Sequence, residues 1–429
     1  MRFNGPANCC RRYIEPSEEH LIEVSQRRFE PAVLVALGLG LFLALALRLS
    51  LFYFESGDYH AFLSPWYDFI LSYGGFSALE HAFSDYSPLY LYLLTLATYL
   101  PLPKLYAIKL ISIAFDFLLA LFVLLIVRLK YENRVVWVSS FFAALFAPTV
   151  FANSAVWGQS DATYASMLVA SIYFAIQRRP NLSVFFFSVG LSFKLQAVFL
   201  FPLFIVLFLK RRVPIYSFLI IPATYMVTLL PAWLAGRPLV ELLMTYPAQA
   251  GQYTLLTQYA PNLYWWVPYD SLSAPQPDSI LLLNRILSWG GIVFTALLVG
   301  LLCLVSWRSP VPLDGDVIVK LSLVSVLLLP FTLPHMHERY FFAADVVSII
   351  YAFYSPKRFY IALIVVAASL FSYLPVIELL PYLAVLLKFL AILMGIALIV
   401  VTADLIRSLY PNSIEQPRSG SPGPGNPKL

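Results

Sequence analysis

Ten apolar runs dominate this 429-residue chain and constrain its fold more than any other feature. A helix needs about 20 predominantly apolar residues to cross the ~30 Å hydrocarbon layer of a bilayer, and several of the runs reach that length. A chain that repeats such runs has lipid as its natural solvent. We therefore expect an all-α polytopic membrane protein. The runs lie at 31–52, 105–129, 135–152, 161–177, 213–235, 283–307, 317–333, 341–355, 359–376 and 380–406.

The composition agrees with this expectation. Apolar residues make up 60% of the chain and charged residues 12%, whereas a soluble domain has about 45–50% and 25%. These values exclude a soluble enzyme, a disordered chain and a nucleic-acid-binding protein. The first 30 residues are polar and contain five arginines, so they do not form a cleavable signal peptide. We expect the first apolar run to stay in the protein as a signal anchor.

Charge helps to place an ambiguous stretch at 88–102, which is apolar over about 14 residues. Basic loops face the cytoplasm in membrane proteins. If this stretch crossed the bilayer, the next helix would place Arg128, Lys130 and Arg134 outside. If it lies in the outer interface as an amphipathic helix, the same residues fall inside. We therefore expect a first outer loop at 53–104 that carries interfacial helices.

A second ambiguous stretch, 182–209, has basic clusters at 178–179 and 210–212 on its two sides. One crossing would put one cluster outside, whereas a hairpin of two short helices keeps both inside. We expect the hairpin to turn near residues 194–196. Its polar turn must then lie within protein or in a wet cavity, because unsatisfied backbone groups cannot face lipid.

With these choices the chain has about twelve membrane helices, both termini are cytoplasmic, and 19 of the 28 lysines and arginines face inward. We expect cytoplasmic tails at 1–30 and 407–429, the second of them disordered, around a membrane domain at 31–406. A second long outer loop is expected at 236–282. No nucleotide-binding fingerprint is present, and no internal repeat of the kind found in many transporters is visible. The working side is therefore expected to be outside.

The first outer loop holds the strongest catalytic candidate, Asp58. A carboxylate at the mouth of a membrane helix, close to aromatic residues, can be partly desolvated, which suits it to general-base catalysis. The alternative is an ordinary solvated loop acid. Trp66, Asp85 and Tyr86 follow in the same loop as candidate substrate ligands.

Three further motifs are expected on the same face. A buried cation near a membrane is costly unless it is paired, so Arg339 and Lys194 are candidates to hold a phosphate. A structural pair between Lys194 and Asp161 is the alternative. The cluster His-x-His-Glu at 335–338 matches no standard zinc spacing, so a divalent metal is not expected, although one is not excluded. The remaining candidate ligands are Gln159, Asp161, Gln196, His335, His337 and Glu338.

Other polar and aromatic features have simpler interpretations. The aromatic segment 264–269 could stack on sugars, but an interfacial aromatic belt is the commoner cause of such a segment. Asp116 and Asp345 lie in or near apolar runs, and we expect them to pair with neighbouring groups.

Chemistry on an outer face needs an energy source other than ATP. An activated group carried by a membrane lipid meets that need, since a polyprenyl phosphate is a good leaving group and its tail fits between helices.

Five motifs occur in the order typical of one family: Gly-Asp58-Tyr, Asp85-Tyr-Ser-Pro-Leu-Tyr, Trp-Gly-Gln159-Ser-Asp, Phe-Lys194-Leu-Gln and His-Met-His-Glu-Arg339. On these the chain resembles the GT-C superfamily of membrane glycosyltransferases. It is most similar to bacterial relatives of the glycosylphosphatidylinositol mannosyltransferases. Two of the motifs also resemble the dolichyl-phosphate-glucose-dependent glucosyltransferases, so the resemblance does not determine the sugar.

The resemblance implies a GT-C-like fold, a location in the bacterial plasma membrane, and an acidic residue of the first outer loop as catalytic base, here Asp58. The donor would be a polyprenyl-phosphate monosaccharide, with mannose favoured. Asp85 is followed by Ser-Pro where relatives commonly have Pro-Pro, which weakens the inference about its role.

The resulting hypothesis is an inverting transfer with no cofactor. Asp58 takes the proton of an acceptor hydroxyl on a glycan, a lipid or a protein. Arg339 and Lys194 stabilise the departing polyprenyl phosphate. Two alternatives remain: a transporter or flippase of lipid-linked sugars, and a ligase that uses a diphosphate-linked oligosaccharide.

Overall fold

The computed structural model describes residues 31–249, 255–267 and 278–411. The tail expected at 1–30, most of the tail expected at 407–429 and parts of the second outer loop lie outside these residues. The chain divides into two compact units, 1–43 and 44–429. In the first unit, residues 31–43 form the N-terminal part of helix α2 (Pro31–Ser50). The remaining helices and strands belong to the second unit.

Helices account for most of the described residues and strands for almost none, as the hydropathy pattern predicts. Six segments are long and apolar enough to cross a membrane, so the protein is a multi-pass membrane protein. The expected total of about twelve membrane helices stays a prediction, because the other apolar helices are shorter. The six are α2, α5 (Lys104–Arg128), η5 with α11 (Ile215–Leu234), α13 (Asp278–Arg308), α14 (Gly315–Thr332) and α17 (Leu387–Leu409).

A bend interrupts the run that we expected as one helix at 135–152. Helix α6 (Arg134–Leu145) is followed by α7 (Pro148–Phe151) and the π-helical turn η3 (Ala152–Trp157), and the two parts meet at 45°. The bend has a local cause. Proline lacks a backbone N–H and disfavours helical geometry in the residue before it, and Ala147 is indeed extended, with φ −58° and ψ 126°.

The remaining apolar runs form shorter helices. Several boundaries differ from expectation. The last run begins as the 3₁₀ helix η9 (Pro381–Leu386), and α17 continues to Leu409 rather than ending at 406, with Leu409 buried on the same helix face as Leu405. The shorter helices are α8 (Asp161–Ile176), α9 (Pro180–Phe193), α10 (Phe201–Leu209), α15 (Phe342–Tyr354) and α16 (Tyr360–Val376).

The hairpin expected at 182–209 is present. Helix α9 ends at Phe193, Lys194 is extended, and the chain continues through the 3₁₀ helix η4 (Leu195–Leu200) into α10. Beyond α10, Ser217 donates a 2.7 Å hydrogen bond to Asn181 at the start of α9. The chain has therefore returned to the end from which it left, and the clusters at 178–179 and 210–212 lie at the same end.

The other basic clusters gather at this end too. Lys130 donates to the main-chain carbonyl of Tyr354, next to the cluster at 357–358. Arg212 donates to the carbonyl of Leu313 over 2.7 Å, which brings the 210–212 cluster beside the loop after α13. We call this the basic end of the second unit.

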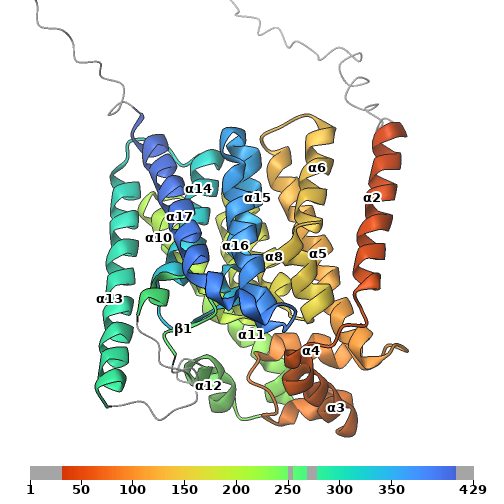
Figure 1. Ribbon diagram of the computed structural model, residues 1–429. Coiled ribbons are helices and arrows are strands. Elements are labelled where there is room, and N and C mark those ends of the chain that lie inside the picture. The colour runs from red at the N-terminus through yellow and green to blue at the C-terminus, as the bar shows by residue number, and fades with distance from the viewer. Residues whose placement is uncertain (1–30, 250–254, 268–277, 412–429) are drawn as a thin grey trace, which may run out of the picture. The chain divides into compact units, whose positions relative to one another are not determined.

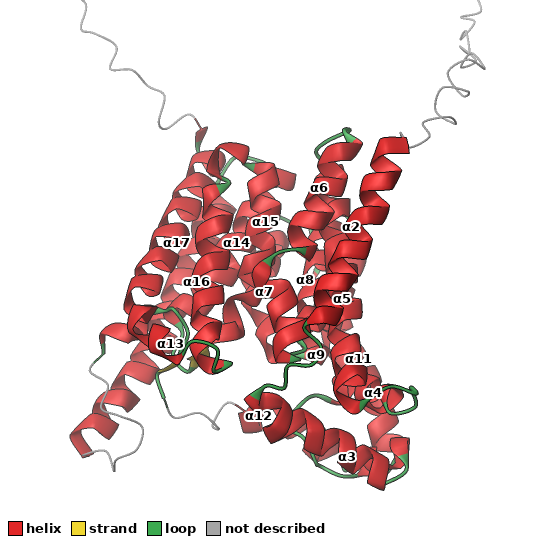
Figure 2. Cartoon of the chain, turned by 45° about the vertical axis from the view of Figure 1, so that its right-hand side comes forward, coloured by secondary structure: helices red, strands yellow, loops and turns green. Residues whose placement is uncertain are grey.

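The opposite end carries the helices of the first outer loop and helix α12 of the second outer loop. Figures 1 and 2 both show α3, α4 and α12 at this end, to which the long helix α13 also extends. Helix α4 has 10 residues, about 15 Å at 1.5 Å per residue, which is too short to cross a bilayer and agrees with the interfacial interpretation. The elements here are η1 (Tyr59–Leu63), α3 (Ser64–Ser72), η2 (Gly75–Glu80), α4 (Pro88–Ala97) and α12 (Leu239–Gln249).

The second outer loop packs back onto the helices at the same end. Its segment β1 (Thr257–Gln258) pairs in parallel with β2 (Met336–His337), followed by η7 (Glu338–Phe341). After β1, the 3₁₀ helix η6 (Leu263–Trp266) packs near α17. The loop therefore covers the motif at 335–339.

A buried ion pair ties the first helices together, as expected for Asp116. Arg48 of α2 lies 2.9 Å from Asp116 of α5 and donates a 2.9 Å hydrogen bond to the carbonyl of Leu145 in α6. Ser154 also donates to Asp116, over 2.6 Å. Asp345 likewise accepts a 2.6 Å hydrogen bond from Ser369. Buried carboxyl groups are tolerated in a fold when they are hydrogen-bonded, as both of these are, or ion-paired, as Asp116 is.

Candidate active site

Asp58 lies where the first outer loop begins, with its side chain one-quarter exposed. Its Oδ2 atom accepts hydrogen bonds from the indole Nε1 of Trp157, at 3.0 Å, and from the amide Nε2 of Gln159, and it lies 3.7 Å from a guanidinium nitrogen of Arg339. Within the described residues no such contact is made by Oδ1. The carboxylate is therefore held through one oxygen and offers the other to a ligand.

A tight turn between η3 and α8 brings the two donors onto Asp58. Gly158 at its centre has φ 79°, in the left-handed region that glycine adopts without strain. Trp157 on one side and Gln159 on the other then both reach the same oxygen. The spacing Trp-Gly-Gln is thus explained by the geometry of the turn.

Arg339 lies between two carboxylates. A guanidinium nitrogen is 3.1 Å from Glu338 and 3.7 Å from Asp58. Burial opposes the charge of the guanidinium, but Glu338 first and Asp58 among the weaker influences raise the pKa of Arg339 above its ordinary value. Burial alone would raise the pKa of Glu338, but a hydrogen bond from His337 and the charge of Arg339 lower it. Both groups of this pair are therefore charged at neutral pH.

Lys194, at the turn of the hairpin, is bound to Asp161. The two charged groups are 2.7 Å apart, and Asn153 donates a 2.8 Å hydrogen bond to the other oxygen of Asp161. The ammonium also lies 5.0 Å from the ring centre of Tyr86. An ammonium has three N–H donors, so the pair orients Lys194 and still leaves it able to meet an anion.

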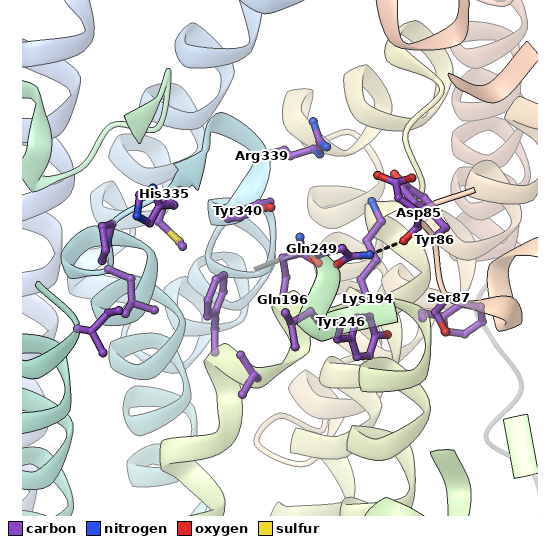
Figure 3. Close-up of a pocket in the computed structure, with 18 residues that line it drawn as sticks. Asp85, Tyr86, Ser87, Lys194, Gln196, Tyr246, Gln249, His335, Arg339 and Tyr340 are labelled. Atoms are coloured by element: carbon purple, nitrogen blue, oxygen red, sulfur yellow. Dashed lines mark hydrogen bonds between the residues drawn. The ribbon is translucent and has the colours of Figure 1, made fainter. Parts of the chain in front are cut away.

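Two adjoining cavities, with volumes of about 300 and 470 Å³, bring the predicted residues together. We call them the first and second cavities. Asp85, Tyr86 and Arg339 line both. Lys194, Gln196 and His335 line the first, as Figure 3 shows. The second adds Asp58, Trp66, Gln159, His337 and Glu338. Asp161 is not among the lining residues of either cavity, and it is bonded to Lys194.

Asp85 is the least satisfied acid of the site. Its main-chain carbonyl accepts a hydrogen bond from the amide of Gln249 (dashed in Figure 3), but its buried Oδ1 has no partner among the described residues. Burial raises the pKa of Asp85. A buried acceptor without a partner is costly, so this atom is suited to receive a hydrogen bond from a ligand hydroxyl.

His335 lines the first cavity, but its ring is already engaged. One ring nitrogen is 3.0 Å from the hydroxyl of Ser288 and the other 2.8 Å from the carbonyl of Leu255. Its backbone N–H also donates to the carbonyl of Leu256. These contacts tie the second outer loop to the wall of the first cavity, and the expected role of His335 as a substrate ligand stays a prediction.

Some lining residues were not anticipated, and Trp265 was considered only as part of the aromatic segment 264–269. Tyr259, Trp265 and Gln258, all from the second outer loop, line the second cavity. Of the aromatic segment at 264–269, Tyr264 is buried and donates to the carbonyl of Thr332 at 2.9 Å, whereas Tyr269 lies outside the described residues. The only sequence evidence for these lining residues was an aromatic segment without charge. That pattern did not indicate which of its residues would line the cavity.

Lys109 of α5 is a further unexpected residue. It is buried, and its ammonium donates to the carbonyls of Phe54, Phe52 and Leu51 at 2.6, 3.2 and 3.3 Å. These carbonyls belong to the segment that leads from α2 to Asp58. Lys109 thus fixes the backbone that precedes Asp58.

We expect Lys109→Met to lower the free energy of unfolding by about 1–3 kcal/mol, because three main-chain acceptors lose their donor. The midpoint of thermal unfolding in detergent measures this loss. Lys104→Met is the matched control, since Lys104 is partly exposed and bonds to the loop acid Asp68; it should change stability by under about 1 kcal/mol. Equal effects of the two substitutions would contradict the role assigned to Lys109.

Within the described ranges, no group of three or more histidine, cysteine, aspartate or glutamate side chains is placed to hold a metal ion. Comparison with known proteins adds no further assignment: no protein-family model matches the chain, and a search of curated proteins finds no significant match.

Proposed function

We propose that this protein is a GT-C-type membrane glycosyltransferase. It moves a hexose, with mannose favoured, from a polyprenyl-phosphate donor to an acceptor hydroxyl. One observation carries the proposal: Asp58, with one carboxylate oxygen uncommitted, lines one cavity with Arg339, which lines the adjoining cavity together with Lys194. A base and two cations around connected space are what sugar transfer from a lipid phosphate requires.

The membrane orientation of the site follows from charge. The basic end of the second unit is assigned to the cytoplasm by the positive-inside tendency. The cavities lie at the opposite end, so the site works on the extracytoplasmic side, and both termini are cytoplasmic. The resemblance of the motifs favours the bacterial plasma membrane.

In the proposed reaction the acceptor hydroxyl gives its proton to Oδ1 of Asp58. Its oxygen then forms a bond to the anomeric carbon, while the bond from that carbon to the phosphate oxygen breaks. The polyprenyl phosphate leaves with the electron pair, and the configuration inverts. Arg339 and Lys194 stabilise the charge that develops on the phosphate. A phosphate leaving group needs no general acid, so one carboxylate suffices.

The two cavities suit the two substrates. The first has apolar walls beside Lys194, including Phe193, Val198 and Ile292, which fit the beginning of an isoprenoid tail. The second combines aromatic side chains with amides, as polyol recognition requires. Among its lining residues, the ring centres of Trp66 and Tyr86 are 5.0 Å apart. We place the acceptor there, on a glycan, a lipid or a protein, and no cofactor takes part.

Transfer by the purified protein tests the proposal. The protein is incubated with a polyprenyl-phosphate sugar labelled in the sugar and with an extract of envelope lipids and glycans. A new glycosidic bond of inverted configuration supports it. Label that crosses vesicle membranes without forming a bond indicates a flippase, and transfer only from a diphosphate-linked oligosaccharide indicates a ligase; either result overturns the proposal.

A further inference from the structure

A groove of about 950 Å³ runs between α6 and α16, and it is larger than either cavity of the candidate active site. Both helices pack against α15, which forms the floor between them. The groove has no part in the proposed reaction, because none of its lining residues borders the first or second cavity.

Small side chains and the bend after α6 create the groove. Ala143, Ala352 and Ala367 line it, so facing helices leave space that larger residues would fill. Pro148, where the chain turns away after α6, also lines it. At the outer edge Leu363 is 62% exposed although it is apolar. In a membrane protein such a trench is filled by hydrocarbon rather than water.

The length of the groove matches one leaflet. Along α16 its lining extends from Phe359 to Phe371, a rise of about 18 Å at 1.5 Å per residue. Half of the ~30 Å hydrocarbon layer is about 15 Å. The lining begins at the basic end, beside Tyr131 and Pro356, and extends to Pro148 and Phe371. It therefore accommodates a single chain from the leaflet that faces the basic end.

The charge at the mouth of the groove indicates which lipid it takes. Arg358 is bonded to Asp404, and Lys130 lies 3.9 Å from Asp316. Lys357, which directly follows the lining residue Pro356, is exposed and has no ion-pair partner among the described residues. Glu132 directly follows the lining residue Tyr131 and is the acidic residue nearest to it in the sequence. Basic residues at the cytoplasmic ends of membrane helices attract anionic head groups.

We propose that this groove is a binding site for one acyl chain of an anionic phospholipid, whose phosphate meets Lys357. The assignment of an anionic phospholipid does not depend on the proposed glycosyltransferase activity, and only the following comparison with the donor rests on it. A polyprenyl phosphate is a poorer candidate, because the groove opens at the end opposite the site where such a donor would react.

Native mass spectrometry of the purified full chain with equimolar phosphatidylglycerol and phosphatidylcholine tests the site. We expect one tightly held phosphatidylglycerol. Ala143→Phe and Ala367→Phe should each weaken its binding at least about tenfold by filling the groove, since each displaced methylene group contributes to affinity. Ala296→Phe, on an exposed position of α13, is the matched control and should bind as the unmodified chain does.

The head-group contact is tested separately. Lys357→Gln should lower the preference for phosphatidylglycerol over phosphatidylcholine about fivefold, whereas Arg407→Gln, also exposed at the basic end, should not. Equal binding of both lipids, or retention of the lipid by both filling variants, would overturn the proposal. So would tighter binding of a polyprenyl phosphate than of phosphatidylglycerol. If the filling variants unfold at a lower temperature even in lipid-free detergent, the groove is filled by protein and the proposal also fails.

Discussion

Asp58→Asn should lower kcat for sugar transfer about 10²–10⁴-fold, the range that a positioned general base contributes. An asparagine has nearly the same shape, and its carbonyl can still accept the hydrogen bonds of Trp157 and Gln159. It cannot take a proton from the acceptor. The KM for the donor should therefore change little, and initial rates over a range of donor concentrations separate the two effects.

Asp68→Asn provides the matched control for this prediction. Asp68 belongs to the same outer loop, but its side chain is 58% exposed and pairs with Lys104 at 2.7 Å, away from both cavities. Its replacement should leave the rate within about twofold, in line with the small value of exposed ion pairs. Turnover close to that of the unmodified chain in Asp58→Asn would remove this residue from the role of base.

Arg339→Gln should lower kcat about 10²–10³-fold, comparable with the loss of one preorganised electrostatic donor at a transition state. The guanidinium is placed to meet charge that develops on the leaving phosphate, and it also offers the paired N–H groups that suit phosphate oxygens. Arg339→Lys keeps the charge but loses the fork, so it should retain part of the rate. Single-turnover measurements with bound donor report on this step directly.

Arg339 has a second partner, so its structural role must be separated from its chemical one. Its loss leaves the buried carboxylate of Glu338 without the guanidinium, and breaking such a pair typically costs about 3–5 kcal/mol of stability. The double substitution Arg339→Gln with Glu338→Gln removes both charges and should restore much of the thermal stability without restoring turnover. Recovery of the rate in the double variant would show that Arg339 acts only through Glu338.

Much of the helical framework could be predicted from hydropathy and charge. The apolar runs became helices, and the hairpin that turns at Lys194 followed from two basic clusters that had to share a side. The same reasoning placed Asp58, Lys194 and Arg339 at one end, where they do line adjoining cavities. Such predictions succeed because membrane insertion depends on sums of apolar and basic residues over long windows, which are properties of the chain itself.

The contacts that shape the site could not be predicted in this way. Only the folded chain shows that a turn at Gly158 places two donors on one oxygen of Asp58, and that Lys109 holds the backbone before it. The pairing of Thr257 with Met336 likewise brings a distant outer loop over the cavity.

Sequence alone thus determined that this is a helical protein of the membrane, where its basic end lies and which motifs share the other end. Tertiary structure decided which oxygen of Asp58 is left without a hydrogen bond, which groups the ring of His335 contacts, and that a groove remains between α6 and α16. The physical reason is the distance over which each effect acts. Burial in lipid and charge at its surface are set by composition over many residues, whereas a hydrogen bond requires two atoms to lie within about 3 Å, and packing between distant segments alone brings them there.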